Sequence, residues 1–100
     1  MYVANGDSST ISVIDVNNNL INTITVPGPI NNDIVLEFNP VNNNIYAANI
    51  GSNTVSVIDI NNNIVDNIVV GNNPRDIEFS PANNIYVANS FSDTVSIIPS

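Results

Sequence analysis

The sequence predicts an all-β protein built from repeated units, and three observations lead to this prediction. A fourteen-residue segment recurs without gaps, as YVANGDSSTISVID at 2–15, YAANIGSNTVSVID at 46–59 and YVANSFSDTVSIIP at 86–99. Short apolar runs rich in β-branched residues, bounded by Asn, Gly, Ser or Pro, are typical of strands. No stretch of eleven or more residues has the apolar spacing of a helix.

The repeat length indicates which kind of β structure to expect. The repeated tyrosines, Tyr2, Tyr46 and Tyr86, set a period of 44 and then 40 residues. The extra residues of the first period fall in the polar links 26–36 and 40–46, where insertions cost little free energy. Four short strands in a repeat of about 40 residues are typical of a β-propeller blade. We therefore predict blades of four antiparallel strands, with about two and a half blades present.

Ten strands are predicted, at 2–5, 10–16, 20–26, 35–38, 45–49, 54–60, 64–70, 76–79, 85–89 and 94–98. They form the last three strands of one blade, in segment 1–33, a full blade in 34–73, and the first three strands of another in 74–100. Asn triplets at 17–19, 42–44 and 61–63 and pairs at 31–32, 72–73 and 83–84 lie between these strands. Asn tolerates a left-handed backbone, so these clusters predict tight turns.

Both faces of the predicted strands carry apolar side chains. Val55 and Val57 point to one face, and Ile58 and Ile60 point to the other. A blade between two neighbours needs both faces apolar, whereas an isolated sheet would have one polar face. A propeller closes with about four to eight blades, so this segment is predicted to be incomplete alone. It is either part of a longer propeller or a chain that assembles with other copies.

The end copies keep the apolar residues of the interior copy, at Ile11, Val13, Val95 and Ile97. We expect these side chains to be buried only against other blades, of the same chain or of other copies, and expect no stable monomer. The unpaired edges of the outermost strands favour association too. A simple ring of copies is disfavoured, because the chain ends on the third strand of a blade and begins on the second.

The repeat resembles a known family. The YVAN and TVSVID strings, followed by an apolar strand, Gly71 and Pro74, are similar to the YVTN-type β-propeller repeat. The chain departs from that pattern at 27–29, where Pro-Gly-Pro replaces the Gly-x-x-Pro link, and in its Asn-rich turns after Pro40 and Pro81. Such repeats are frequent in archaeal surface-layer proteins and bacterial surface proteins. The resemblance thus implies a non-enzymatic extracellular or cell-surface scaffold for protein–protein interaction or self-assembly, as in a surface layer or a filament.

Charge and composition exclude several classes of function. The net charge is −8, with nine acidic residues against Arg75 alone, so no nucleic acid is expected as a partner. The apolar runs are too short to insert into a membrane. The chain has no His, Cys or Lys, so no catalytic residue and no cofactor are predicted. The alternative is a fragment of a propeller enzyme, such as a lyase-like protein, whose catalytic residues lie outside this segment.

Eight recurring residues are assigned a structural role in the repeat. The tyrosines are expected to pack between blades with bonded hydroxyls, and the Asp residues to begin turns. The alternative for the Asp residues, together with Asp7 and Asp93, is calcium held with Asn oxygens; Pro99 replaces the Asp in the third copy, so no metal is assigned. The eight are Tyr2, Asn5, Asp15, Tyr46, Asn49, Asp59, Tyr86 and Asn89.

Four charged residues are possible partner or interblade contacts. Arg75 adjoins Asp76 and is near Glu78, which predicts a structural ion pair, with a partner-facing role as the alternative. Glu37 and Glu78 occupy the same position in the strand predicted nearest the axis. They are expected to line a channel or to bond neighbouring backbone.

Overall fold

The computed structural model is all-β and describes residues 1–5, 8–26, 34–80 and 82–99. Within them it contains no α-helix; the 3-10 turn η2 (Ile50–Ser52) was not expected from the sequence. The strands are β1 (Tyr2–Asn5), β2 (Thr10–Ile14), β3 (Leu20–Thr25), β4 (Ile34–Asn39), β5 (Asn44–Asn49), β6 (Thr54–Ile58), β7 (Ile64–Val69), β8 (Pro74–Phe79), β9 (Asn84–Asn89) and β10 (Thr94–Pro99).

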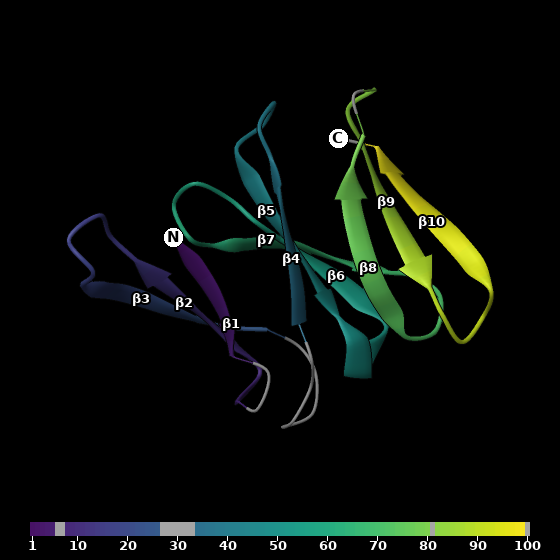
Figure 1. Ribbon diagram of the computed structural model, residues 1–100, viewed down its shortest axis with the longest axis horizontal. Helices are drawn as coiled ribbons and strands as arrows, with labels where there is room; N and C mark the ends of the chain where they lie inside the picture. Colours follow the sequence, from purple (N-terminus) through teal and green to yellow (C-terminus); the bar gives the residue numbers. More distant parts are fainter. Residues whose placement is uncertain (6–7, 27–33, 81, 100) are drawn as a thin grey trace.

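The strands form three small antiparallel sheets. The first has the order β1-β2-β3, the middle sheet β4-β5-β6-β7 and the third β8-β9-β10. Figure 1 shows them following one another across the molecule, with the middle sheet between the other two. This grouping of three, four and three strands is the one that the repeat predicts, because each hairpin joins neighbouring strands of one sheet.

Two strands end two residues earlier than their apolar sequence predicts. The patterns 10–16 and 54–60 are strand-like throughout, but β2 stops at Ile14 and β6 at Ile58. In each case the next residue is an Asp whose carboxylate accepts two backbone N–H groups of the following Asn triplet, which closes a turn. Val16 and Ile60 are therefore exposed in the turns, and Ile60 does not share a covered face with Ile58.

The Asn clusters supply the left-handed turn positions. Eight described non-glycine residues have positive φ, and six of them are Asn. They include the middle residue of every triplet, namely Asn18, Asn43 and Asn62. Because an amide side chain tolerates this conformation better than most, turn chemistry explains these clusters, as predicted. The pair at 31–32 and the link at 27–29 lie outside the described residues.

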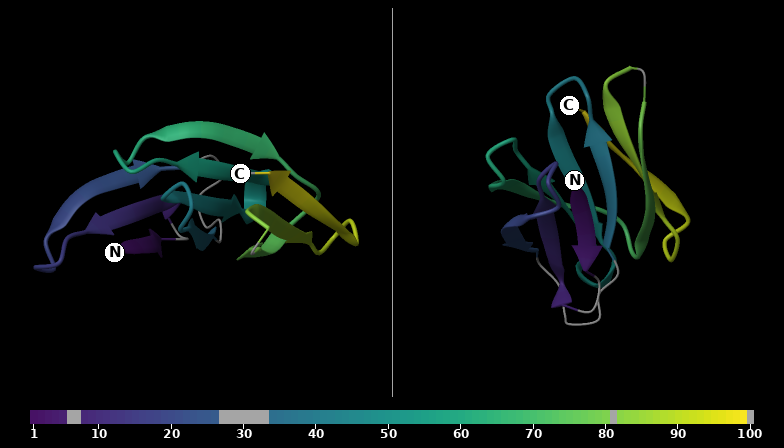
Figure 2. Two further views of the ribbon diagram at one scale, coloured as in Figure 1. Left: turned by 90° about the horizontal axis from the view of Figure 1, so that it is seen from above. Right: turned by 60° about the vertical axis from the view of Figure 1, so that its left-hand side comes forward.

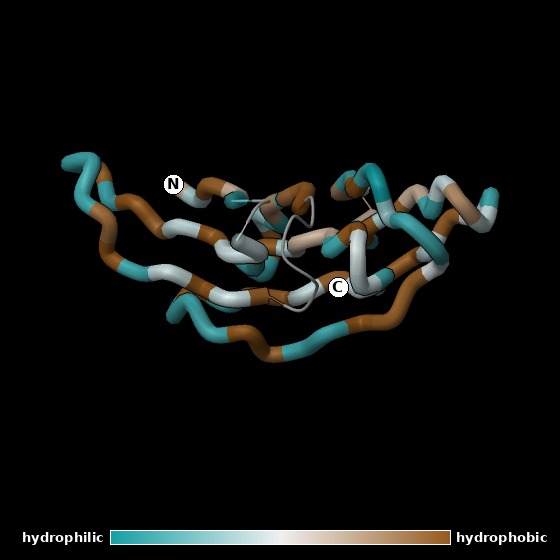
Figure 3. The backbone as a smooth tube through the Cα atoms, turned by 90° about the horizontal axis from the view of Figure 1, so that it is seen from below, coloured by the Kyte–Doolittle hydropathy of each residue, from teal (hydrophilic) through white to brown (hydrophobic). Residues whose placement is uncertain are grey.

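Strand register divides the repeated residues between two faces of each sheet. Tyr46 lies opposite Val57, and Ala48 lies opposite Val55, so these four share one face. Ile45 pairs with Ile58 and lies on the other face with Ala47, because successive strand residues alternate. We name these the tyrosine face and the isoleucine face. Figure 3 shows the alternation of hydrophobic and hydrophilic residues along the strands.

Two hydrophobic cores join the three sheets, and each forms where the tyrosine face of one sheet packs on the isoleucine face of the next. In one, the tyrosine face of the first sheet packs on the isoleucine face of the middle sheet. In the other, the tyrosine face of the middle sheet packs on Ile85, Val87 and Ile98 of the isoleucine face of the third. Both faces of the middle sheet are thus covered, as its sequence predicts.

The expectation that all four apolar end residues need an assembly for burial is wrong for two of them. Ile11 and Val13 are 0% and 5% exposed within the single chain, because the first sheet turns its tyrosine face toward the middle sheet. Val95 and Ile97 are 62% and 59% exposed, because the same face of the third sheet has no sheet against it in the described chain.

The sheets form an open row rather than a closed ring. β4 contacts both β1 and β8. The strand of each sheet that comes first in the chain therefore lies beside its counterpart in the next sheet. No strand of the first sheet packs extensively on the third in the described part of the chain. Figure 2 shows the resulting bowed shape, with extents of 40 × 32 × 18 Å. Both outer faces of the row are therefore left uncovered by the residues that the structure describes.

The link from the middle to the third sheet, residues 70–73, is hydrogen-bonded to both sheets through Asn73. Asn73 is buried; its backbone N–H donates to Asn53 Oδ1 at 2.9 Å, and its Nδ2 donates to Ser90 Oγ at 2.8 Å. Gly71, in the same link, lies so close to the third sheet that an added Cβ would be 2.6 Å from Ser92 Oγ and 2.9 Å from Asn89 Cβ.

Replacing Gly71 with alanine should therefore destabilise the fold. The new methyl group has to displace Ser92 and Asn89, which themselves form a hydrogen-bonded turn, and overpacking of this kind costs about 1–3 kcal/mol. Urea unfolding measures the loss, with Val69→Ala as the control, since Val69 is 81% exposed on the preceding strand. Equal stability of the two variants would contradict the close approach.

Candidate functional site

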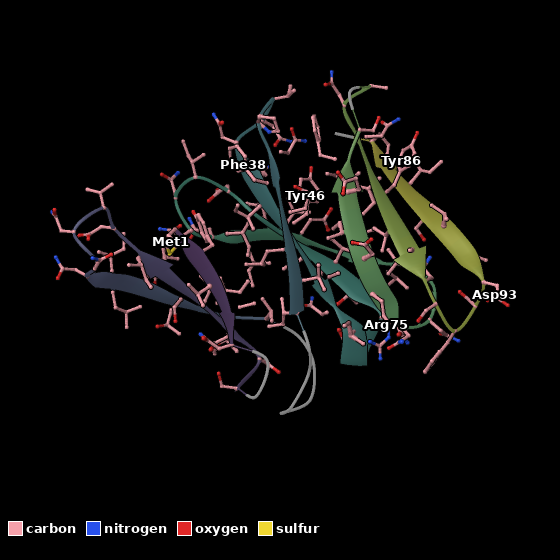
Figure 4. The ribbon with its side chains drawn as sticks, viewed as in Figure 1. Met1, Phe38, Tyr46, Arg75, Tyr86 and Asp93 are labelled. Atoms are coloured by element: carbon pink, nitrogen blue, oxygen red, sulfur yellow. The ribbon has the colours of Figure 1, made fainter. Side chains whose placement is uncertain are left out.

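The two uncovered sheet faces at the ends of the row are the strongest candidate interaction site. The tyrosine face of the third sheet exposes Tyr86, Ala88, Val95 and Ile97. The isoleucine face of the first sheet carries Met1, Val3, Ile14 and Leu20, all exposed except Ile14, which is half-buried. Figure 4 shows Met1 and Tyr86 on opposite sides of the view, on the first and third sheets. Uncovered apolar faces of this kind mark surfaces for association.

The three tyrosines share one position in the repeat but have different surroundings. Tyr2 donates its hydroxyl hydrogen to Asn62 Oδ1 at 2.8 Å, across the junction of the first and middle sheets. Tyr46 is 3% exposed, and its hydroxyl accepts a hydrogen bond from Asn42 Nδ2 at 3.3 Å. Tyr86 is 42% exposed, and its hydroxyl makes no hydrogen bond to any described residue.

A polar network recurs beside each tyrosine strand. Asn49 Nδ2 donates to Thr54 Oγ1 at 3.1 Å and to Ser56 Oγ at 2.9 Å. Asn5 and Asn89 make the same two bonds to the equivalent Thr and Ser residues. Asn49 and Asn89 are buried, and their Oδ1 atoms find no hydrogen-bond partner among the described residues. The network holds each hairpin in register, which is a structural role.

Asp15 and Asp59 serve their own turns in the structure. Each Oδ1 accepts backbone N–H groups two and four residues ahead, at 2.9 and 3.0 Å. Within the described residues no three His, Cys, Asp or Glu side chains form a group that could hold a metal ion. Asp93 is exposed and has a φ of 54°, and Asp7 lies outside the described residues.

Acid should weaken the turn at residues 15–19, which the carboxylate of Asp15 closes. The backbone N–H of Asn19 is the main cause that lowers the pKa of Asp15 below its usual value, and the N–H of Asn17 adds to it. A carboxyl with a lowered folded-state pKa stabilises the fold above its unfolded pKa, near 3.8, and this stabilisation is lost as pH falls through the folded pKa. Thermal melts from pH 7 down to pH 2 should therefore decline less for Asp15→Asn than for the original chain. An equal decline would contradict the role of the carboxylate.

The predicted ion pair of Arg75 is not formed with Asp76 or Glu78 among the described residues. The register between β8 and β9 shifts at Arg75. Pro74 lies opposite Asn89 and Asp76 lies opposite Ala88, so Arg75 is an extra residue in β8. Its side chain is exposed, and Asp76 instead accepts the N–H of Ile77 at 2.9 Å. A β-bulge redirects the bulged side chain, which the alternating sequence pattern does not reveal.

Glu37 lines a pocket at the junction of the first and middle sheets. The pocket has a volume of about 330 Å³ and is otherwise lined by Tyr2, Leu36, Phe38 and Ile45. Glu37 Oε1 accepts the N–H of Phe38 at 3.2 Å, and the equivalent Glu78 is exposed on β8. The pocket is open and mostly apolar, and Glu37 is the one carboxylate among its lining residues.

Sequence reasoning missed the isoleucine face of the first sheet. The residues Met1, Val3, Ile14 and Leu20 occupy the repeat positions of Ile45, Ala47, Ile58 and Ile64; the middle sheet buries the first three of these and partly buries Ile64. The signal was present, because aligning the copies over the whole period pairs these positions. The sequence prediction named Ile11, Val13, Val95 and Ile97 as the apolar residues of the end copies, and all four lie on tyrosine faces.

None of the described helical segments is long and apolar enough to cross a membrane. No protein-family model, curated protein or solved structure matches this chain.

Proposed function

We propose that the three sheets are blades of an incomplete β-propeller and that the protein is a non-enzymatic scaffold, binding protein partners or copies of itself. The observation that carries this proposal is the pair of uncovered apolar faces at the two ends of the row. The repeated packing of tyrosine face on isoleucine face supports the assignment to blades, as does the contact of β4 with both β1 and β8.

The residues available for chemistry support a scaffold over an enzyme. The chain lacks His, Cys and Lys, and the described pocket has Glu37 and Tyr2 as its ionisable side chains. The hydroxyl of Tyr2 already donates to Asn62. The rival proposal, a segment of a propeller enzyme, requires a His or metal-ligand cluster facing the axis in a longer parent chain. Finding such a cluster would replace the scaffold proposal.

The location we propose, a cell surface or secreted assembly, is supported by the resemblance to YVTN-type repeats. Protease treatment of intact source cells tests it. A surface protein should be cleaved while cytoplasmic markers stay intact. Full protection of the protein on intact cells, with cleavage after lysis, would contradict a surface location.

The assignment to blades is tested by adding further copies of segment 34–73 to the chain. A propeller should show a jump in melting temperature and become a protease-resistant monomer at one repeat number, between about four and eight blades. An open solenoid would instead gain stability smoothly with each added repeat. The second result would overturn the propeller proposal while leaving the three sheets as described.

A further inference from the structure

We propose that the tyrosine face of the third sheet binds the isoleucine face of the first sheet in a second copy of this chain, so that two copies form a closed head-to-tail ring. This inference rests on the proposed function, since it treats each sheet as a blade. It names the partner as the chain itself and assigns the contact to Tyr86, Val95 and Ile97 of one copy and Val3, Ile14 and Leu20 of the other.

Complementarity of the two faces is demonstrated twice inside each copy. At both internal junctions a tyrosine face packs on an isoleucine face, and the positions used are equivalent in the repeat. Ile11 and Val13 of the first sheet, like Val55 and Val57 of the middle sheet, are buried in this way. The two faces left uncovered are one of each kind, so a second copy offers each of them the surface that it packs against elsewhere.

A hydrogen bond of the internal junction gives the contact its register. Tyr2 of the first sheet donates to Asn62 in the turn between β6 and β7 of the middle sheet. The equivalent of Asn62 in the first sheet is Asn18, which has the same φ of 65° and follows Asp15 as Asn62 follows Asp59. The same packing between copies places the unpaired hydroxyl of Tyr86 against Asn18 of the second copy.

The number of sheets determines how many copies close the ring. The described part of each copy has three sheets, so two copies provide six and three copies provide nine. Because propellers close with about four to eight blades, two copies are the number that fits. The contact is heterologous, with different patches on the two sides, and such contacts give rings only when the rotation closes.

The sequence disfavours a simple ring of copies because the end sheets are incomplete, but the exposed faces of these sheets still allow the contact. The faces meet through β9 and β10 of one copy and through β1, β2 and the first residue of β3, Leu20, of the other. The first sheet lacks a counterpart of β4, and so leaves β8 of the partner copy uncovered. The exposed carboxylates of Asp76 and Glu78 on β8 therefore stay in water, which avoids the cost of burying unpaired charge.

Sedimentation of the 100-residue chain tests the proposal directly. We expect a monomer–dimer equilibrium between 10.7 kDa and twice that mass. Because each copy has a net charge of −8, added salt should strengthen the dimer by screening repulsion. Ile97→Asp should abolish the dimer, whereas Val69→Asp, at an exposed position outside both faces, should not. Circular dichroism checks that each variant keeps its strand content.

Mixing two variants tests the head-to-tail polarity. Leu20 is 63% exposed on the isoleucine face, so Leu20→Asp should also abolish the dimer of the chain on its own. An equimolar mixture of Ile97→Asp and Leu20→Asp keeps one intact face of each kind and should form a one-interface heterodimer. A Leu20→Asp chain that still dimerised alone would show pairing of two tyrosine faces and overturn the proposal.

A double-mutant cycle tests the register. Tyr86→Phe and Asn18→Ala should each weaken the dimer by about 4-fold to 100-fold, because losing one hydrogen bond costs about 2-fold to 10-fold and the closed ring contains this bond twice. Together they should weaken it no more than either alone, because both remove the same bond. Fully additive losses would overturn the assigned pair. A concentration-independent monomer, or filaments in place of a dimer, would overturn the closed ring while leaving the blade test by added repeats unaffected.

Discussion

Replacing Ile58 with alanine should lower the free energy of unfolding by about 2–5 kcal/mol, the range seen for large-to-small changes in well-packed cores. Ile58 is fully buried on the isoleucine face of the middle sheet, where the tyrosine face of the first sheet covers it. A loss of this size is a large part of the roughly 5–15 kcal/mol that stabilises a typical domain.

The matched control for this change is the same substitution at Ile14. Ile14 occupies the equivalent repeat position in the first sheet, but its face is uncovered and its side chain is half-buried. Urea unfolding at low protein concentration, where the chain is dissociated, should show less than half the loss for Ile14→Ala. Equal losses at the two sites would contradict the packing of the first sheet on the middle sheet.

Replacing Asn49 with alanine should cost about 2–4 kcal/mol, because it deletes two hydrogen bonds and leaves the buried Ser56 hydroxyl without the donor that it accepts from. Asn49 is fully buried, and Ser56, which it contacts, also donates to Asn67 Oδ1 on β7 at 2.6 Å. The change therefore disturbs the pairing of three strands of the middle sheet.

Asn5 provides the comparison for Asn49. It makes the same two bonds, to Thr10 and Ser12, but is half-buried, so water can replace part of what alanine removes. Asn5→Ala should therefore destabilise the fold clearly less than Asn49→Ala in the same urea experiment. Equal losses at the two sites would show that the bonds, rather than their burial, determine the effect.

Much of the local structure was predictable from the sequence. The ten strands, their grouping and the turns at the Asn clusters follow from the repeat and its alternation, because these depend on neighbours in the chain. The same alternation predicts that Ile11 and Val13 share a face. The early ends of β2 and β6 were missed, because the Asp carboxylate competes for backbone N–H groups that the apolar pattern alone assigns to a strand.

The sequence by itself determined that this protein is a row of equivalent sheets, each apolar on both faces. Only the tertiary structure decided which face of each end sheet is covered, so that Val95 is exposed while its counterpart Ile11 is buried. The physical reason is that the two faces are nearly equal in hydrophobicity, so strand alternation cannot distinguish them. The side on which the next sheet lies depends on the direction of the links and on packing between residues far apart in the chain.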